Sequence, residues 1–388
     1  MKGVFIGLAL VAACSGTASD PSPAAASEPA TAIYGPAVAV AEAVDPAEPP
    51  GPPVPSEEPF EEPSVASVAR ELAEVQPEVT AVSAADSRDA VVAELHTLSP
   101  DPAPEHTTND VHYLVSNERR LDLFRPELDD LGGVMLGVGS DQNYVMAAWS
   151  RTELLVIVDF DQQVVDLHGI HGALMAAAPT VDEYRRLWSE DGADDARAAI
   201  TDAFDEPARH ERLALYDEAR TVVDKRLRKL ARRYTELGIH SYLDTPEEYR
   251  FVADLHAAGR VVALRGDFTR EGLLREVARV LEAHSQALKV LYLSNIEQYF
   301  TYREPFKANM LALPFDDHTV VLRTLPGRPV GFHYILQRGA DFHTWMRTPK
   351  VWSVYRIRGL GKGEHLQSSE RFVAGPPPAP EPNPVEGD

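Results

Sequence analysis

The distribution of apolar and polar residues changes along the 388-residue chain. After a short apolar start, residues 15–104 are rich in Pro, Ala and Glu and hold few large apolar side chains. Such a segment buries too little surface to offset its ordering entropy, which predicts a disordered stalk. Apolar runs and helical patterns then alternate over residues 105–372, which predicts one folded domain. The Pro-rich residues 373–388 predict a disordered tail.

Four apolar runs of the folded part are typical of strands buried on both faces of a parallel sheet. They lie in the segments GGVMLGVGS, ELLVIVDFD, RVVALRGDFT and KVLYLSNIEQYF, and helical patterns follow them. Further strands are predicted in HTVVLRTL, in GFHYILQ and around Trp345, with an antiparallel hairpin at the sheet edge. This alternation predicts an α/β fold with a doubly wound, mainly parallel sheet.

A long helical section interrupts the alternation at about residues 179–259. Thr180 and Glu183 form a capping box at its first helix. A helix from about Glu206 to Leu237 ends at Gly238, and Pro246 marks the first position of another helix. We therefore predict a helical insert, or lid, on the sheet. Two shorter helical patterns, SVASVARELAEV and SRDAVVAELHTL, lie in the stalk and either form transiently or dock on the domain.

Polar residues follow the predicted strands at the edge where doubly wound sheets bind ligands. The candidate ligand-binding residues are Gly137, Gly139, Asp141, Gln142, Asp159, Asp161, Asp267 and Ser294, and the candidate catalytic residues are Asn295 and Tyr299. The glycines would let a ligand approach the backbone, and an acid closing the second strand is placed to accept hydrogen bonds from ribose hydroxyls. The alternatives are a tight glycine turn, aspartates that cap the next helix, and polar residues that only begin a helix.

The motifs GVGSDQNY, VDFD, RGDFT and YLSNIEQYF resemble the class I S-adenosylmethionine-dependent methyltransferase fold. The resemblance covers roughly Leu131 to Arg347 outside the insert. It implies S-adenosylmethionine or a nucleotide-like molecule as ligand, with Asp267 facing the adenine, and methyl transfer as the activity. With VSNE near residue 116, the same set is similar to an uncharacterised bacterial family. Asp141 stands where a third glycine is usual, and its charge would disfavour a bound carboxylate unless a cation intervenes. The alternative is a non-catalytic interaction module that keeps the fold as a scaffold.

The first fourteen residues resemble a lipoprotein signal peptide. Lys2 precedes an apolar stretch from Val4 to Ala13, which is too short to span a bilayer, and Val-Ala-Ala-Cys14 resembles a lipobox. This resemblance implies lipidation of Cys14 and a lipid anchor in a membrane of the cell envelope. Ser15 resembles the outer-membrane sorting pattern. The alternative is an ordinary signal peptide with a chance cysteine.

The net charge of −23 argues against general nucleic-acid binding. Against this background the run Lys225–Arg233 holds six bases in nine residues. The run is either a solvated helix face or a contact for anionic lipid head groups or another acidic partner. His168 and His171 lie three residues apart, but no third ligand follows at an obvious spacing, so we predict no metal site.

Overall fold

A seven-stranded sheet organises the part of the chain that the structure, a computed structural model, describes: residues 84–104, 111–327, 331–360 and 371–378. Its strands are β1 (Val134–Gly137), β2 (Leu154–Asp159), β3 (Val261–Arg265), β4 (Leu288–Tyr292), β5 (Phe315–Gly327), β6 (Gly331–Arg338) and β7 (Arg371–Ala374). Their order is β3-β2-β1-β4-β5-β6-β7. Strands β1 to β5 are mutually parallel, β6 is antiparallel to β5, and β7 is parallel to β6. The predicted doubly wound, mainly parallel α/β fold is confirmed.

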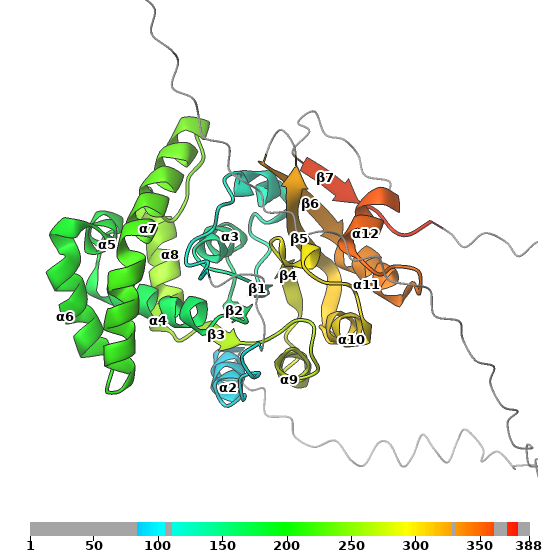
Figure 1. The fold of residues 1–388 in the computed structure, drawn as a ribbon, viewed down its shortest axis with the longest axis horizontal. Helices are drawn as coiled ribbons and strands as arrows, with labels where there is room; N and C mark the ends of the chain where they lie inside the picture. The colour runs from blue at the N-terminus through cyan, green and yellow to red at the C-terminus, as the bar shows by residue number, and fades with distance from the viewer. Residues whose placement is uncertain (1–83, 105–110, 328–330, 361–370, 379–388) are drawn as a thin grey trace, which may run out of the picture. The chain divides into compact units, whose positions relative to one another are not determined.

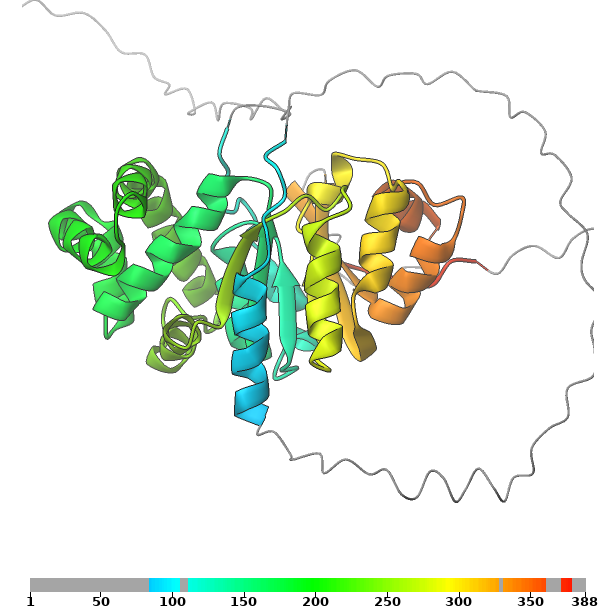
Figure 2. The same cartoon turned by 90° about the horizontal axis from the view of Figure 1, so that it is seen from below.

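Helices cover both faces of this sheet (Figures 1 and 2). They are α2 (Ala84–His96), α3 (Gln142–Ser150), α4 (Gln162–Ala177), α5 (Val181–Trp188), α6 (Ala193–Ala203), α7 (Ala208–Leu237), α8 (Pro246–Ala257), α9 (Leu273–Ala283), α10 (Glu304–Ala312), α11 (Gly339–Arg347) and α12 (Val354–Leu360), with 3-10 turns η1 (Leu121–Glu127), η2 (Glu190–Gly192) and η3 (Ile296–Gln298). Alternate strand residues enter two cores. Leu155 and Ile157 pack with α3, α4 and the insert, whereas Val156 packs with α2 and α9. Burial on both faces explains why β2 is a continuous apolar run.

Helices α5 to α8 form the predicted insert, which lies on one side of the sheet in Figure 1. The Thr180 hydroxyl accepts a hydrogen bond from the Glu183 N–H, as the capping-box pattern predicts. Helix α7 ends where Gly238 adopts a left-handed conformation, with φ of 65°. Among the described residues, no helix is long and apolar enough to cross a membrane.

The folded part begins before the predicted boundary at residue 105. Helix α2 forms in the second short pattern of the stalk, and Val91 and Leu95 are fully buried in the core around α9. Asp101 then caps α9 by accepting a hydrogen bond from the Leu273 N–H at 3.0 Å. Apolar side chains on one face of α2 and the carboxylate of Asp101 therefore dock this segment on the domain. The pattern SVASVARELAEV and residues 1–14 lie outside the described residues.

The strand predicted around Trp345 is wrong, because this residue lies in helix α11. Phe342, Trp345 and Met346 follow a helical spacing and are buried against the sheet. The last strand is β7 instead, beside β6 at the sheet edge. The order of the described structure thus extends to residue 378, beyond the predicted end at residue 372.

Candidate functional site at the carboxyl edge of the sheet

The strand order reverses between β1 and β4, which lie side by side although more than 150 residues separate them. In doubly wound sheets, ligands bind beyond the carboxyl ends of the strands at such a switch point. The loop after β1, with Gly139 and Asp141, and the residues after β4, with Ser294, come to this edge. The structure therefore brings the first and last predicted motifs together.

Side chains of the chain itself fill the space beside the glycine loop. Gly139 has φ of 86°, which favours glycine. A Cβ atom at Gly139 would collide with the Gln142 amide, and one at Gly137 would collide with Asn143 Oδ1. The Gln142 amide also accepts a hydrogen bond from the Ser140 N–H and donates one to the Val138 carbonyl. The glycines thus admit the polar side chains that shape their own loop.

The two aspartates after β2 hold backbone groups. Asp159 is buried and accepts hydrogen bonds from the Gly139 N–H at 3.1 Å and the Asp161 N–H at 3.0 Å. Burial raises the pKa of Asp159 to about 7. Asp161 is the N-cap of α4, because its carboxylate accepts the Gln163 N–H, and it also contacts His112 Nδ1 at 2.7 Å. The helix-capping interpretation therefore describes Asp161.

Asp267 likewise forms hydrogen bonds within the protein. Its carboxylate accepts hydrogen bonds from the N–H and hydroxyl of Thr269, and its N–H donates to Asp101. Asn295 precedes the turn η3, and its side chain makes no capping hydrogen bond there. The Tyr299 side chain is exposed. Asn295 and Tyr299 therefore follow β4 as predicted, near the same edge.

A buried carboxylate that was not among the candidate site residues, Glu118, lies at this edge; it is the last residue of the VSNE motif. It accepts hydrogen bonds from the hydroxyls of Ser294 at 2.9 Å, Thr324 at 2.5 Å and Tyr292. Burial raises its pKa. Three hydroxyl donors from β4, β5 and the loop after β4 satisfy the carboxylate, so Glu118 holds the segment of residues 115–120 across the carboxyl ends of the strands.

The cation that Asp141 requires comes from the insert. Arg226, on α7, donates from Nε to the fully buried carboxylate of Asp141 at 2.8 Å, and from Nη1 to the Glu118 carbonyl at 2.7 Å. The Ser116 N–H also donates to Asp141. One arginine of the basic run therefore ties the insert, the glycine loop and the 115–120 segment together.

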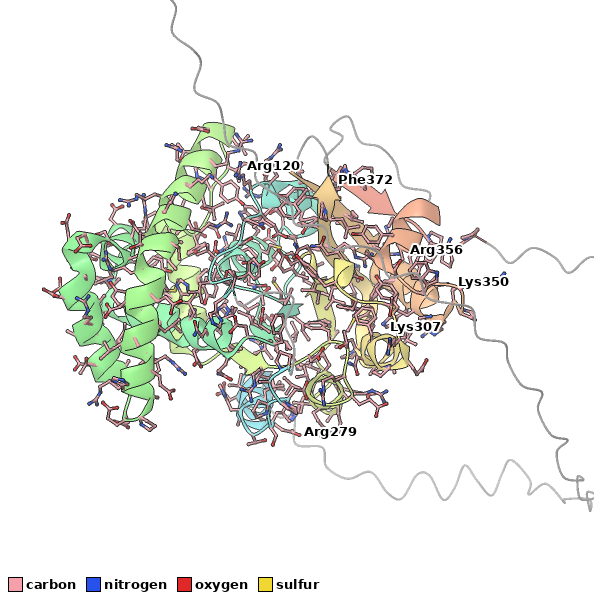
Figure 3. The ribbon with its side chains drawn as sticks, viewed as in Figure 1. Arg120, Arg279, Lys307, Lys350, Arg356 and Phe372 are labelled. Carbon is pink, nitrogen blue, oxygen red and sulfur yellow. The ribbon has the colours of Figure 1, made fainter. Side chains whose placement is uncertain are left out.

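Four of the other five bases of that run line a cavity of about 850 Å³, here called the basic groove, between α7, the 115–120 segment and β6; Arg228 does not line it. It is lined by Val115, Ser116, Asn117, Arg119, Arg120, Val222, Lys225, Arg226, Lys229, Leu230, Arg232, Arg233, Glu236, Gly331, Phe332 and Tyr334. Seven of these residues are cationic and one is acidic. Figure 3 shows Arg120 beside the C-terminal part of α7. Repulsion from Arg119, with smaller contributions from burial and the neighbouring bases, lowers the pKa of Lys229.

The two histidines considered as metal ligands lie on α4 and are buried. His168 Nε2 contacts the Gly139 carbonyl at 2.9 Å, and its Nδ1 contacts the Tyr144 hydroxyl at 2.6 Å. Because a carbonyl only accepts, Nε2 carries the proton and Nδ1 accepts from Tyr144. His171 contacts the Tyr184 hydroxyl. Within the described ranges no three His, Cys, Asp or Glu residues are grouped so that they could hold a metal ion.

Fold and site define a doubly wound α/β protein with a helical insert and a cation-lined groove at the carboxyl edge of its sheet. Residues 113–369, more than half of the chain, match the family described as a domain of unknown function (DUF7790), and the chain belongs to that family. The match includes the 115–120 segment, the insert and every strand except β7. No curated protein matches the chain.

Proposed function

We propose that the chain is a binding module whose basic groove takes a ligand bearing phosphate or carboxylate groups. One observation carries this proposal: a protein with a net charge of −23 gathers seven cationic residues and one acid around one cavity. An acidic protein gains no solubility from such a cluster, and like charges repel each other unless an anion lies between them.

The charge of the groove is only partly compensated. Asp141 neutralises Arg226, and Asp122 pairs with Arg120. Arg232 and Arg233 share the single carboxylate of Glu236 at 3.9 and 4.0 Å. Among the described residues, no ion pair neutralises Arg119, Lys225 or Lys229. About four of the seven positive charges therefore remain for a ligand: those of Arg119, Lys225 and Lys229, and one of the Arg232/Arg233 pair.

The groove also has apolar walls. Val115, Val222, Leu230 and Phe332 line it together with the bases, and 44% of the Val222 side chain is exposed. Burial of apolar area favours binding, and the cations fix the orientation of the ligand. The lining therefore supports a ligand that joins an anionic group to an apolar part.

Calorimetric titration with inorganic pyrophosphate at low ionic strength tests the anionic half of this proposal. Removing two exposed charges in Lys225→Gln/Lys229→Gln should weaken binding about 2- to 30-fold, at about 0.2–1 kcal/mol for each charge. The matched control is Arg347→Gln/Lys350→Gln, which removes two exposed cations outside the groove and should leave the affinity unchanged. Lys350 is labelled in Figure 3. If the wild-type chain binds no pyrophosphate, or both variants bind equally well, the groove is not the anion site.

A methyltransferase-like pocket is the second candidate. Two observations support it: β1 to β5 follow the order of classical dinucleotide-binding sheets, and Arg226 supplies the cation that Asp141 needs beside a bound carboxylate. We favour the basic groove because the carboxylates of Asp159, Asp161 and Asp267 already accept hydrogen bonds from the protein itself. Titration with S-adenosylmethionine and S-adenosylhomocysteine decides between them, since binding that Asp159→Ala abolishes would place the ligand at the glycine loop.

We also propose that the protein is exported and anchored in the cell envelope through a lipid on Cys14. The lipobox-like residues before Cys14 support this, together with the absence of any other cysteine from the sequence. A binding domain on such an anchor would work close to a membrane surface.

A further inference from the structure

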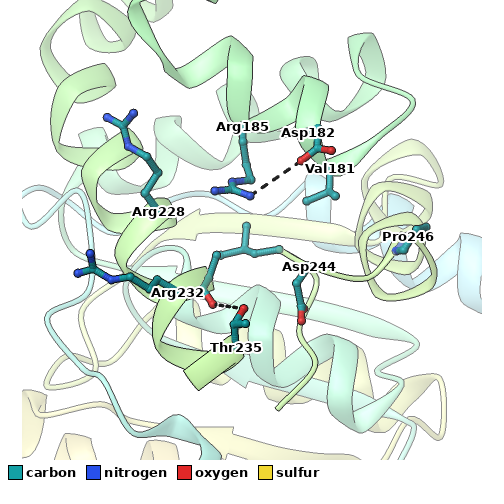
Figure 4. A pocket seen from close by; sticks show the side chains of 10 residues that line it. Val181, Asp182, Arg185, Arg228, Arg232, Thr235, Asp244 and Pro246 are labelled. Atoms are coloured by element: carbon teal, nitrogen blue, oxygen red, sulfur yellow. Dashed lines mark hydrogen bonds and ion pairs between the residues drawn. The ribbon is translucent and has the colours of Figure 1, made fainter. Parts of the chain in front are cut away.

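The basic groove covers only one flank of a wider cationic surface on α7. A second cavity, of about 430 Å³, lies on the other flank, between α7, α5 and the start of α8 (Figure 4). It is lined by Val181, Asp182, Arg185, Arg228, Ala231, Arg232, Thr235, Leu243, Asp244 and Pro246. Arg232 belongs to both linings, so the two cavities meet at the C-terminal half of α7.

Helix geometry places the exposed cations of this half on one broad face. At about 100° per residue, Lys225, Arg228, Lys229, Arg232 and Arg233 fall within an arc of about 140°. They span about 12 Å along the axis at 1.5 Å per residue. Their side chains reach solvent, with exposed fractions of 62% for Arg228, 75% for Arg232 and 42% for Arg233. Arg226 lies about 20° beyond the edge of this arc, and its side chain is buried against Asp141.

The face keeps a net positive charge. Between residues 222 and 236 its acids are Asp224, which pairs with Arg228, and Glu236, so five exposed bases face two acids and leave about three charges. A small anion inside the groove reaches only the groove flank. A flat anionic surface contacts both flanks at once, and Figure 1 shows the C-terminal end of α7 at the tip of the insert, where such a surface can approach it.

An apolar side chain lies on the same face. Val222 precedes Lys225 by about one turn, falls within the same arc, and is 44% exposed. When such a helix lies on an anionic membrane, its bases contact the phosphates, and an exposed apolar side chain enters the boundary of the acyl chains.

From these observations we infer that the C-terminal half of α7, from Val222 to Arg233, docks on anionic lipid head groups. This inference rests on the proposed anion-binding function and names its partner: phosphate groups presented at a membrane surface. Both flanks contact neighbouring head groups of one surface. Lys225 and Lys229 do so on the groove flank, and Arg185 and Arg228 do so on the outer flank.

Vesicle sedimentation of the full chain tests this inference, with Cys14→Ser present throughout so that no acyl group contributes. Binding to phosphatidylcholine vesicles is compared with binding to vesicles that also contain phosphatidylglycerol. The measured quantity is the increase in vesicle-bound protein when phosphatidylglycerol is present. Because the same chain is compared on two kinds of vesicle, a contribution of the N-terminus that is common to both cancels. We expect a gain that falls as salt rises, because the charges are exposed.

Two double variants, each of which removes two positive charges, distinguish the contributions of the two flanks. Arg185→Gln/Arg228→Gln alters residues outside the groove, so it should lower vesicle partitioning, by about fivefold for each charge that is lost, and leave pyrophosphate binding unchanged. Lys225→Gln/Lys229→Gln should lower both. The control Arg347→Gln/Lys350→Gln should lower neither.

Each other outcome has a defined meaning. Pyrophosphate binding without any gain from phosphatidylglycerol overturns the membrane inference and leaves the proposed function standing. The membrane inference is also overturned if Arg185→Gln/Arg228→Gln binds vesicles as well as the wild type, because the groove flank then acts alone. Absence of binding to both pyrophosphate and vesicles overturns the inference and the proposed function together.

Discussion

Replacing Arg226 by Met should destabilise the domain far more than any other single change in the basic run. Asp141 is fully buried and Arg226 is 7% exposed, so the substitution leaves a carboxylate in the interior without its cation. It also removes hydrogen bonds of 2.8 Å to Asp141 and 2.7 Å to Glu118. Removing one partner of a buried ion pair costs about 3–5 kcal/mol. The two hydrogen bonds donated by the charged guanidinium give a similar range of about 3–6 kcal/mol.

Urea unfolding of the wild type, Arg226→Met, Asp141→Asn and the double variant measures this pair. The double variant should be more stable than Arg226→Met, because no uncompensated charge remains buried, with a coupling of about 1–3 kcal/mol. Arg228→Met is the control: it lies two residues away on α7, its side chain is 62% exposed, and it should cost less than about 1 kcal/mol. Equal losses for Arg226→Met and Arg228→Met would refute the reasoning.

Three further predictions concern other parts of the chain. Burial lowers the pKa of His168 to about 4, so this residue should contribute a loss of stability of about 3 kcal/mol as pH falls from about 6.5 through 4; His168→Gln should reduce the pH dependence measured by urea unfolding, while buried His171 and His256 keep the rest. A chain beginning at residue 105 should lose about 3–6 kcal/mol relative to one beginning at Pro77, because it lacks α2 and Asp101, and equal thermal transitions would contradict the docking of α2. Cys14→Ser should abolish fatty-acid labelling, and persistent labelling would refute the lipid anchor.

Periodicity predicted most elements because one physical signal dominates each. The apolar run of β2 fits a sheet covered on both faces, where every side chain of the strand is buried. Gly238 ends α7 because its left-handed conformation costs a glycine little. Trp345 misled the strand prediction, since a short apolar segment fits either structure until its spacing from Phe342 and Met346 is considered.

The site was harder to predict because its decisive contacts are long-range. Arg226 is one of six bases in the run Lys225–Arg233, and only the crossing of α7 over the loop after β1 distinguishes it. Glu118 lies in a segment without periodicity, yet it holds three hydroxyls from distant elements. The sequence patterns located the residues that follow the strand ends. Which of these side chains form hydrogen bonds within the protein depends on side-chain packing, which a sequence pattern does not encode.

The pKa of Lys229 gives the most direct measurement of the central claim, that the basic groove binds anions. In the free protein, repulsion from Arg119 lowers this pKa. An anion between the two side chains stabilises the charged amine, so the pKa should rise when pyrophosphate is added. Lysine side-chain NMR, with Lys229 assigned through the Lys229→Gln variant, follows this titration. A higher pKa of Lys229 in the presence of pyrophosphate is the predicted result, and an unchanged pKa at millimolar pyrophosphate would contradict it.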